Sequence, residues 1–488
     1  MARLRVAVPA LSPTLEIGGI GTMDIKPTLS ESLLGYQLLP YPGGILGAAL
    51  GRPDRFVGRL AEAWTVSADG RTIEMLLREV VRSVAGNELT AEDVRYTLER
   101  GFHVPGYYRW TAEVAGLRSP EDVVVLDRRR VRFRLATPSE FFLDTRAFPM
   151  NGIFDSRLLR QEATADDPWA ERFVAAHPAG FGPYTVEEVR PGERMTFRAR
   201  ADYYRGQPAF HQVVYQVVAD ASERERLLAR GAVDHALGLA IPQLLRLREL
   251  AHLQVVFGPS TSVFGLALQC RGTPLANVHL RRAIASAVPY QTILQDVFHG
   301  VARPWRGYLP PIVAGYDERL WPYREDPVRA RMELDAAGPP TSWQLEILCN
   351  AGLPTHRPTA ERLVGALAAI GLPATVCELP AEAYFARRAA RNYQAALVDA
   401  GPMVADAGYQ LAHDYCSDSE GNDFGYANPQ VDALVREGLT TAHPARRAAC
   451  YATAQRLLAE DVPLVPLAAP GFALAVHRRV RGIAWYPR

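Results

Sequence analysis

The strongest constraint on the fold is a regular alternation of short apolar strands and amphipathic helices between residues 343 and 399. In order, the pattern predicts a strand at 343–349, a helix at 358–370, a strand at 373–379, a helix at 381–391 and a strand at 394–399. Strands joined through helical crossovers pair in parallel, so this run predicts a mostly parallel sheet. Strands and helices alternate along the rest of the chain too, which indicates an α/β protein.

Local signals place several other elements. Thr90 is expected to begin a helix as its N-cap. Asp93 stands three residues later, a partial match to the capping box, which usually has Glu or Gln at that position. The periodicity of residues 278–299 predicts one long helix. Residues 326–337 predict another helix, ended by Gly338.

Length and charge exclude several classes of protein. The chain has 488 residues, is 48% hydrophobic and carries a formal net charge of +1. This length predicts two or three domains. The charge gives no electrostatic reason to expect nucleic acid or an anionic membrane as a partner. No run of 18 apolar residues is present, so no transmembrane segment is expected.

Lysine is nearly absent from the chain. Lys26 is the single lysine among 54 basic residues. A Walker site needs a lysine on the phosphates, and a Schiff-base enzyme needs a lysine amine, so both kinds of chemistry are excluded. Arginine is therefore the expected partner of any anionic group of a ligand.

The odd number of cysteines leaves at least one thiol free in a monomer, and the sequence does not determine how the others pair. The five are Cys270, Cys349, Cys377, Cys416 and Cys450, and none forms a C-x-x-C pair or a Cys/His cluster with zinc spacing. We therefore expect no metal and no cofactor. Cys349 and Cys377 fall on predicted strands, which favours buried free thiols, with a disulfide in a secreted product as the alternative.

Enzyme signatures are missing from the sequence. It contains no G-x-S-x-G elbow, no H-E-x-x-H and no dinucleotide fingerprint. The closest acid–base group is the triplet formed by His413, Asp414 and Tyr415. Adjacent side chains on a helix point in different directions, so this triplet is expected to form no dyad. A solvent-facing or loop-capping role is favoured, with ligand contact as the alternative.

Several short motifs recur in a fixed order across nearly the whole chain. They lie at residues 60–70, 89–94, 182–184, 202–206, 280–288, 425–434 and 457–466. In this order and spacing they resemble the family 5 extracellular solute-binding proteins. These are the oligopeptide-, dipeptide- and nickel-binding components of ABC importers. Most of the matched residues are structural, so the resemblance specifies a fold more firmly than a ligand.

The resemblance implies a periplasmic-binding-protein-like fold of the large three-domain form, with two lobes around a central cleft that closes by a hinge. Lobe one would comprise residues 1–45, 171–260 and 470–488, with 46–170 as an extra domain. Lobe two would be 261–469. Residues 259–262 and 468–471 are the expected hinges, because they are small or contain proline.

The chain departs from the family where ligands are bound. After the strand at 394–399, peptide-binding members carry a loop with a tryptophan and several acids. Here Pro402 stands at the tryptophan position and Asp406 is the one acid that remains. We predict Asp406, Met403 and Tyr409 as ligand contacts. The departures also indicate a ligand other than an ordinary peptide.

A second group of candidates lies elsewhere. Tyr107, Tyr108 and Trp110 follow a Pro-Gly turn and are predicted to cover a ligand, with packing inside the domain as the alternative. One of the three arginines Arg387, Arg388 and Arg391, with Arg388 as the candidate, is predicted to clamp an anionic ligand group, and a solvated helix face is the alternative.

Two functions are consistent with these patterns. The first is the ligand-capture subunit of an ABC importer, a monomer outside the cytoplasm that takes a small-molecule or peptide-like solute and docks on a permease. It requires a signal peptide removed from the native precursor. The second is a cytoplasmic protein of the same fold, adapted as an enzyme or ligand sensor if Met1 is the native start. Asp406, His413 and Asp414 would then be its acid–base candidates. A carrier of nickel or of a metal chelate is a third hypothesis.

Overall fold

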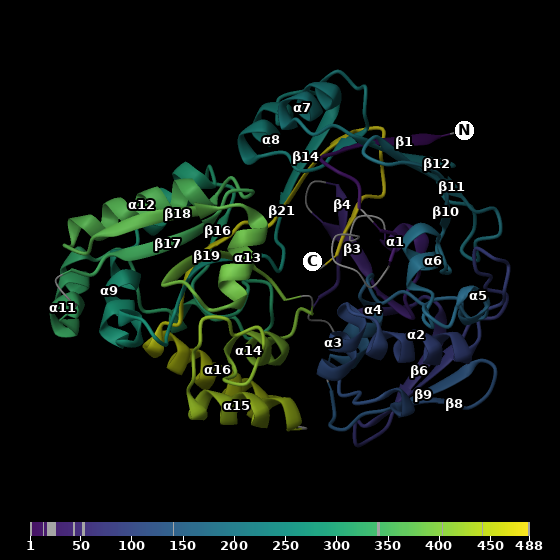
Figure 1. The fold of residues 1–488 in the computed structure, drawn as a ribbon, viewed down its shortest axis with the longest axis horizontal. Helices are drawn as coiled ribbons and strands as arrows, with labels where there is room; N and C mark the ends of the chain where they lie inside the picture. Colours follow the sequence, from purple (N-terminus) through teal and green to yellow (C-terminus); the bar gives the residue numbers. More distant parts are fainter. Residues whose placement is uncertain are drawn as a thin grey trace. The chain divides into compact units, whose positions relative to one another are not determined.

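The structure is a computed structural model that describes residues 2–12, 14–16, 26–41, 44–50, 54–139, 141–338, 342–402, 404–441 and 443–486. The chain divides into two compact units, which are described separately (Figure 1). Unit 1 combines Met1–Val255 with Leu474–Tyr486, and unit 2 is Val256–Ala473. The chain therefore passes from one unit to the other twice. Each helix in the described residues is too short or too polar to cross a lipid bilayer.

The main sheet of unit 1 has the strand order β10-β11-β12-β1-β13-β21-β14. Its strands are β1 (Arg3–Val8), β10 (Tyr184–Arg190), β11 (Arg194–Ala199), β12 (Gln212–Val217), β13 (His235–Ala236), β14 (Leu253–Gly258) and β21 (Phe472–His477). The N-terminal strand β1 pairs in parallel with β12 and β13, whereas β10, β11 and β12 form an antiparallel meander. Strands β14 and β21 are neighbours, and they carry the chain between the units.

A second sheet of unit 1 has the order β6-β7-β9-β8 and is entirely antiparallel. Its strands are β6 (Ala61–Val66), β7 (Thr72–Leu77), β8 (Val123–Val125) and β9 (Arg130–Arg134). A two-stranded sheet pairs β2 (Leu34–Tyr36) with β5 (Phe56–Gly58). A three-stranded sheet has the order β22-β4-β3, with strands β3 (Leu38–Tyr41), β4 (Ile45–Ala48) and β22 (Ala484–Trp485). Phe133 of β9 and Phe142 lie in one buried cluster, with ring centroids 5.0 Å apart. Such apolar burial is the main source of stability for this sheet.

The helices of unit 1 are α1 (Lys26–Leu29), α2 (Ala91–His103), α3 (Tyr107–Val114), α4 (Phe142–Ala147), α5 (Ser156–Glu162), α6 (Glu171–Ala176), α7 (Ala221–Ala229) and α8 (Ile241–Arg248). Helix α2 begins as the sequence predicts. The Asp93 carboxylate accepts the backbone N–H of Thr90 at 2.7 Å and its hydroxyl at 2.9 Å. The acid thus supplies acceptors for donors that a helix start leaves unpaired.

Unit 2 is built on a sheet with the order β16-β20-β15-β19-β17-β18. Its strands are β15 (Val263–Leu268), β16 (Arg303–Pro304), β17 (Leu345–Asn350), β18 (Ala374–Leu379), β19 (Ala395–Ala400) and β20 (Leu464–Ala469). The predicted alternation at 343–399 is confirmed, and its three strands pair in parallel. The prediction of a mostly parallel sheet is wrong, because β15, β16 and β20 join it through antiparallel pairs.

The helices of unit 2 are α9 (Val278–Ala287), α10 (Tyr290–Thr292), α11 (Pro327–Ala337), α12 (His356–Ala369), α13 (Ala381–Ala389), α14 (Ala407–Tyr415), α15 (Pro429–Thr440) and α16 (Pro444–Asp461). In Figure 1 the yellow-green helices α15 and α16 lie side by side and α14 packs beside them. Helix α11 ends at Gly338 as predicted, with a left-handed backbone at φ 57°.

The single helix predicted at 278–299 is wrong. Helix α9 ends at Ala287, and Val288 takes an extended backbone with ψ 127° before Pro289. The proline ring disfavours helical backbone at the residue before it and removes one amide donor. The chain then resumes as α10 and a wide helical turn at Ile293–Val297.

Candidate ligand-binding site

The loop after β19 is the segment in which the sequence places the ligand contacts. Asp406 is the N-cap of α14, and its carboxylate accepts the backbone N–H of Tyr409 at 2.9 Å. A helix start favours such an acceptor, so part of the Asp406 carboxylate is committed to holding this helix. Met403 lies outside the described residues.

Tyr409 lies on the packed side of α14. Its side chain is buried, and its ring is stacked on the His413 ring with centroids 5.9 Å apart. One residue earlier, a Cβ on Gly408 would lie 2.1 Å from the hydroxyl oxygen of Tyr451. The helix therefore fits closely against α16 in unit 2, and a glycine is needed at that contact.

His413 and Asp414 form the pair that the sequence argument excluded. His413 Nδ1 lies 2.6 Å from Asp414 Oδ1, and the Gln410 side-chain amide donates to the other oxygen of Asp414. The expectation of no dyad is wrong, because Nδ1 lies close to the backbone and a neighbouring short carboxylate reaches it. Burial by itself lowers the pKa of His413, but its hydrogen bond with Asp414 and the negative charges of Asp414 and Asp423 outweigh burial and raise it.

Arg388 is paired inside unit 2. Its guanidinium lies 2.5 Å from the Asp423 carboxylate and 5.7 Å from the centroid of the Tyr384 ring. Burial raises the pKa of Asp423, and the positive charge of Arg388 opposes that rise. The neighbouring Arg387 pairs with Glu346 at 2.6 Å, and Arg391 donates to the Asn422 carbonyl at 2.9 Å. These arginines hold their own unit together, and Arg388 is already neutralised.

The aromatic candidates belong to α3. The side chains of Tyr107 and Trp110 lie outside the described part of the structure. Tyr108 is buried, its hydroxyl donates to the Gly152 carbonyl, and its ring lies 6.0 Å from that of Phe154. This arrangement matches the packing alternative for Tyr108.

The five cysteines are free thiols, which agrees with the interpretation favoured for Cys349 and Cys377. Cys349 is buried on β17, and Cys377 lies on β18 with intermediate exposure. Burial raises the pKa of the Cys349 thiol to about 12, so it stays protonated near neutral pH. Within the described residues, no group of three or more His, Cys, Asp or Glu side chains is placed to hold a metal ion.

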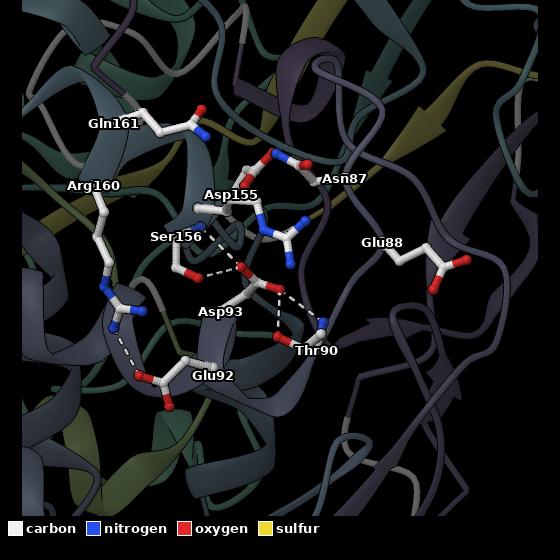
Figure 2. Close-up of a pocket in the computed structure, with 10 residues that line it drawn as sticks. Asn87, Glu88, Thr90, Glu92, Asp93, Asp155, Ser156, Arg160 and Gln161 are labelled. Carbon is white, nitrogen blue, oxygen red and sulfur yellow. Dashed lines mark hydrogen bonds and ion pairs between the residues drawn. The ribbon is translucent and has the colours of Figure 1, made fainter.

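A polar pocket of about 370 Å³ opens in unit 1 at the starts of α2 and α5 (Figure 2). Asp93 lies at its centre, where it accepts from Thr90 and from the backbone and hydroxyl of Ser156 at 2.8 and 2.6 Å. Asp155 accepts from Leu158 N–H and the Asn87 amide, both at 2.9 Å. Both oxygens of each carboxylate thus accept hydrogen bonds from their own unit, and these bonds fix the starts of α2 and α5.

Sequence reasoning missed one polar contact at the end of β19. The Asp399 carboxylate lies 2.7 Å from Nε2 of His356, the first residue of α12. The two residues are far apart in sequence, and no spacing motif joins them. Their separate positions, one at a strand end and one at a helix start, were visible, but only the strand order brings them together.

Comparison with known proteins decides the family. The family model described as "bacterial extracellular solute-binding proteins, family 5 Middle" matches residues 55–422. The chain belongs to this family. The predicted periplasmic-binding-protein-like α/β fold and the predicted role as a solute-binding protein of an ABC importer are thereby confirmed.

Relatives of this family 5 protein match it along most of its length. A probable D,D-dipeptide-binding periplasmic protein of Escherichia coli is 28% identical, over 88% of this chain and 82% of its own. The di/tripeptide-binding protein 2 of Pseudomonas aeruginosa is 28% identical, over 88% and 84%. The crystal structure of a dipeptide-binding protein of a Pseudoalteromonas species with Met-Leu superposes with a TM-score of 0.84 at 22% identity, over 99% and 97%. These comparisons give no support to the enzyme or the cytoplasmic hypothesis.

Proposed function

We propose that this family 5 solute-binding protein captures a peptide-like solute outside the cytoplasm and delivers it to the permease of an ABC importer. The observation that carries the proposal is the family match over residues 55–422, because it includes the candidate loop at 401–411. The names of the relatives, a D,D-dipeptide-binding and a di/tripeptide-binding protein, support a peptide-like ligand. The loop departures at Pro402 and Asp406 favour a close analogue of a short peptide over an ordinary peptide.

The remaining parts of the proposal follow from the family resemblance. The protein works as a monomer in the periplasm, or lipid-anchored at the cell surface. Residues 46–170 form an extra domain within lobe one. The segments 259–262 and 468–471, next to strands β14 and β21 where the chain crosses between the units, provide the hinge. Asp406 and the loop around it contact the ligand from unit 2.

Native mass spectrometry of the purified chain, followed by calorimetry with a library of di- and tripeptides, tests the proposal. We expect a co-purified peptide-like mass, or micromolar or tighter binding of at least one library member. A chain that carries no such mass and binds no di- or tripeptide would refute the proposed ligand class. Deletion of the gene in its host should also abolish uptake of the peptide that binds.

A further inference from the structure

Unit 1 contains a second pocket, at a place for which the sequence predicted no ligand contact. Its volume is about 200 Å³. This is smaller than the roughly 300–1,000 Å³ of pockets for drug-sized ligands, so the pocket suits a small molecule or ion. Apolar side chains such as Pro149 and Pro183 line it together with Glu31, Arg59 and Arg205, all of them in unit 1. Two arginines and one acid make its charged lining net positive.

Glu31 is held by tyrosine hydroxyls at one of its two carboxylate oxygens. Oε2 accepts the hydroxyl of Tyr203 and, at 3.4 Å, the hydroxyl of Tyr204. Burial raises the pKa of Glu31, and the positive charges of Arg59 and Arg78 together with the two tyrosine hydroxyls oppose that rise. The carboxylate is therefore fixed by unit 1, and it loses its charge at a higher pH than an exposed glutamate does.

Arg59 is a largely buried cation whose acid is not in close contact. Its side chain is 13% exposed, and its one ion-pair partner in the described residues is Glu31, with Nη1 3.8 Å from Oε1. This distance is longer than a hydrogen bond. A Cβ on Gly35, which also lines the pocket, would lie 2.5 Å from Nε of Arg59, so the glycine leaves room for the guanidinium. A guanidinium carries five N–H donors, and Arg59 therefore keeps donors for a ligand anion.

Arg205 supplies a second guanidinium to the same pocket. It directly follows Tyr203 and Tyr204, whose rings pack edge to face with centroids 5.0 Å apart, so the chain that carries it is anchored beside Glu31. Arg205 is exposed, and it has no hydrogen-bond or ion-pair partner in the part of the chain that the structure describes. Guanidinium groups bind carboxylate and phosphate oxygens through paired N–H donors.

We propose that this pocket of unit 1 binds a small oxyanion, a carboxylate or a phosphate, through Arg59 and Arg205. Glu31 opposes the anion while it is ionised, and it donates a hydrogen bond to the anion once it is protonated. A charge-assisted hydrogen bond of this kind contributes roughly ten- to hundredfold in affinity. The site is built by unit 1 alone, so it adds to the capture of a peptide-like solute and does not depend on it.

The test titrates the full chain with sodium lactate and, separately, with sodium phosphate, at an ionic strength held constant with sodium chloride. Binding is followed by ligand-observed NMR, and lactamide serves as the neutral analogue of lactate. The variants are Arg205→Gln, Arg59→Gln and Glu31→Gln. The matched control is Arg118→Gln, which removes another exposed arginine of unit 1 that does not line the pocket. Because Arg205 and Arg118 are both exposed, neither change should disturb folding.

The wild type and Arg118→Gln are expected to bind lactate or phosphate with a millimolar or lower Kd and to ignore lactamide. The anion that binds more tightly identifies the source of the oxyanion. Arg205→Gln and Arg59→Gln should each weaken binding by at least about tenfold. Lactate should bind the wild type more tightly as pH falls through the raised pKa of Glu31, and Glu31→Gln should remove this pH dependence.

Three results would overturn the inference. In the first, neither anion binds the wild type. In the second, Arg205→Gln and Arg59→Gln bind both anions as tightly as Arg118→Gln does. In the third, lactamide binds as tightly as lactate. None of these results bears on the proposed capture of a peptide-like solute, which the titration with di- and tripeptides tests separately.

Discussion

Removal of one charge from a buried ion pair should destabilise unit 1 strongly. Glu16 accepts from Arg100 through two bonds, Nη1 to Oε1 at 3.0 Å and Nη2 to Oε2 at 2.7 Å. The Arg100 side chain is 2% exposed and that of Glu16 13%. Arg100 Nε also donates to the Trp169 carbonyl at 2.9 Å, and the guanidinium lies over the Phe154 ring. Glu16→Gln leaves this fixed, buried cation without an anion, which costs about 3–5 kcal/mol.

In a unit of this size, each kcal/mol lost from the free energy of unfolding lowers the midpoint temperature of thermal unfolding by about 2–4 °C. Scanning calorimetry should therefore show the midpoint of unit 1 lowered by roughly 6–20 °C in Glu16→Gln. The control is Asp166→Asn, which removes an exposed partner of Arg172 and should leave the midpoint unchanged. Pairing Glu16→Leu with Arg100→Met removes both charges and should cost less than the sum of the single changes. A Glu16→Gln midpoint equal to that of the control would refute the reasoning.

Three further predictions concern α14, with a glycine of α12 as a control. Asp406→Ala should lower the free energy of unfolding of unit 2, measured by urea titration, by about 1 kcal/mol through loss of the helix cap, and Asp406→Ser should retain most of the stability. Equal free energies of unfolding for the two variants would contradict the capping role. The pKa of His413 is raised on folding, so its stabilising contribution is present below its unfolded pKa and is lost as pH rises through its folded pKa. His413→Gln should therefore be more destabilising at about pH 5.5 than at about pH 8.5, and a penalty independent of pH would argue against it. Gly408→Ala should lower the free energy of unfolding by about 1–3 kcal/mol, because the new Cβ meets the Tyr451 hydroxyl. As a control, Gly365→Ala, which lies in open space on α12, should leave the free energy of unfolding unchanged or raise it by up to about 1 kcal/mol in the same urea titration.

The elements that could be predicted from sequence are those fixed by neighbouring residues. The strands and helices of 343–399, the Thr90 helix start and the Gly338 stop each depend on a few adjacent side chains and on local periodicity. The break at Pro289 was also a local signal, and the apolar spacing on either side obscured it. The capping role of Asp406 could likewise have been predicted, since an acid followed by a helical pattern is a common helix start.

What sequence could not supply depends on partners distant along the chain. The antiparallel neighbours of the parallel strands come from β15 and β20, whose pairing no local pattern specifies. The contact of His356 with Asp399 likewise depends on which strands are adjacent. The contact of His413 with Asp414 depends on rotamers, which a helical repeat does not determine.

Unit 2 is one continuous segment of chain inserted into unit 1 between the two neighbouring strands β14 and β21. The chain leaves unit 1 after Val255 and returns at Leu474, in adjacent strands of one sheet. The ends of the inserted segment touch, since a Cβ on Gly471 would lie 2.2 Å from the Gly258 carbonyl oxygen. Ends this close are what allow a domain to be inserted into a host or excised from it. A chimera that exchanges this whole segment for that of a relative needs only two splice points, lying side by side.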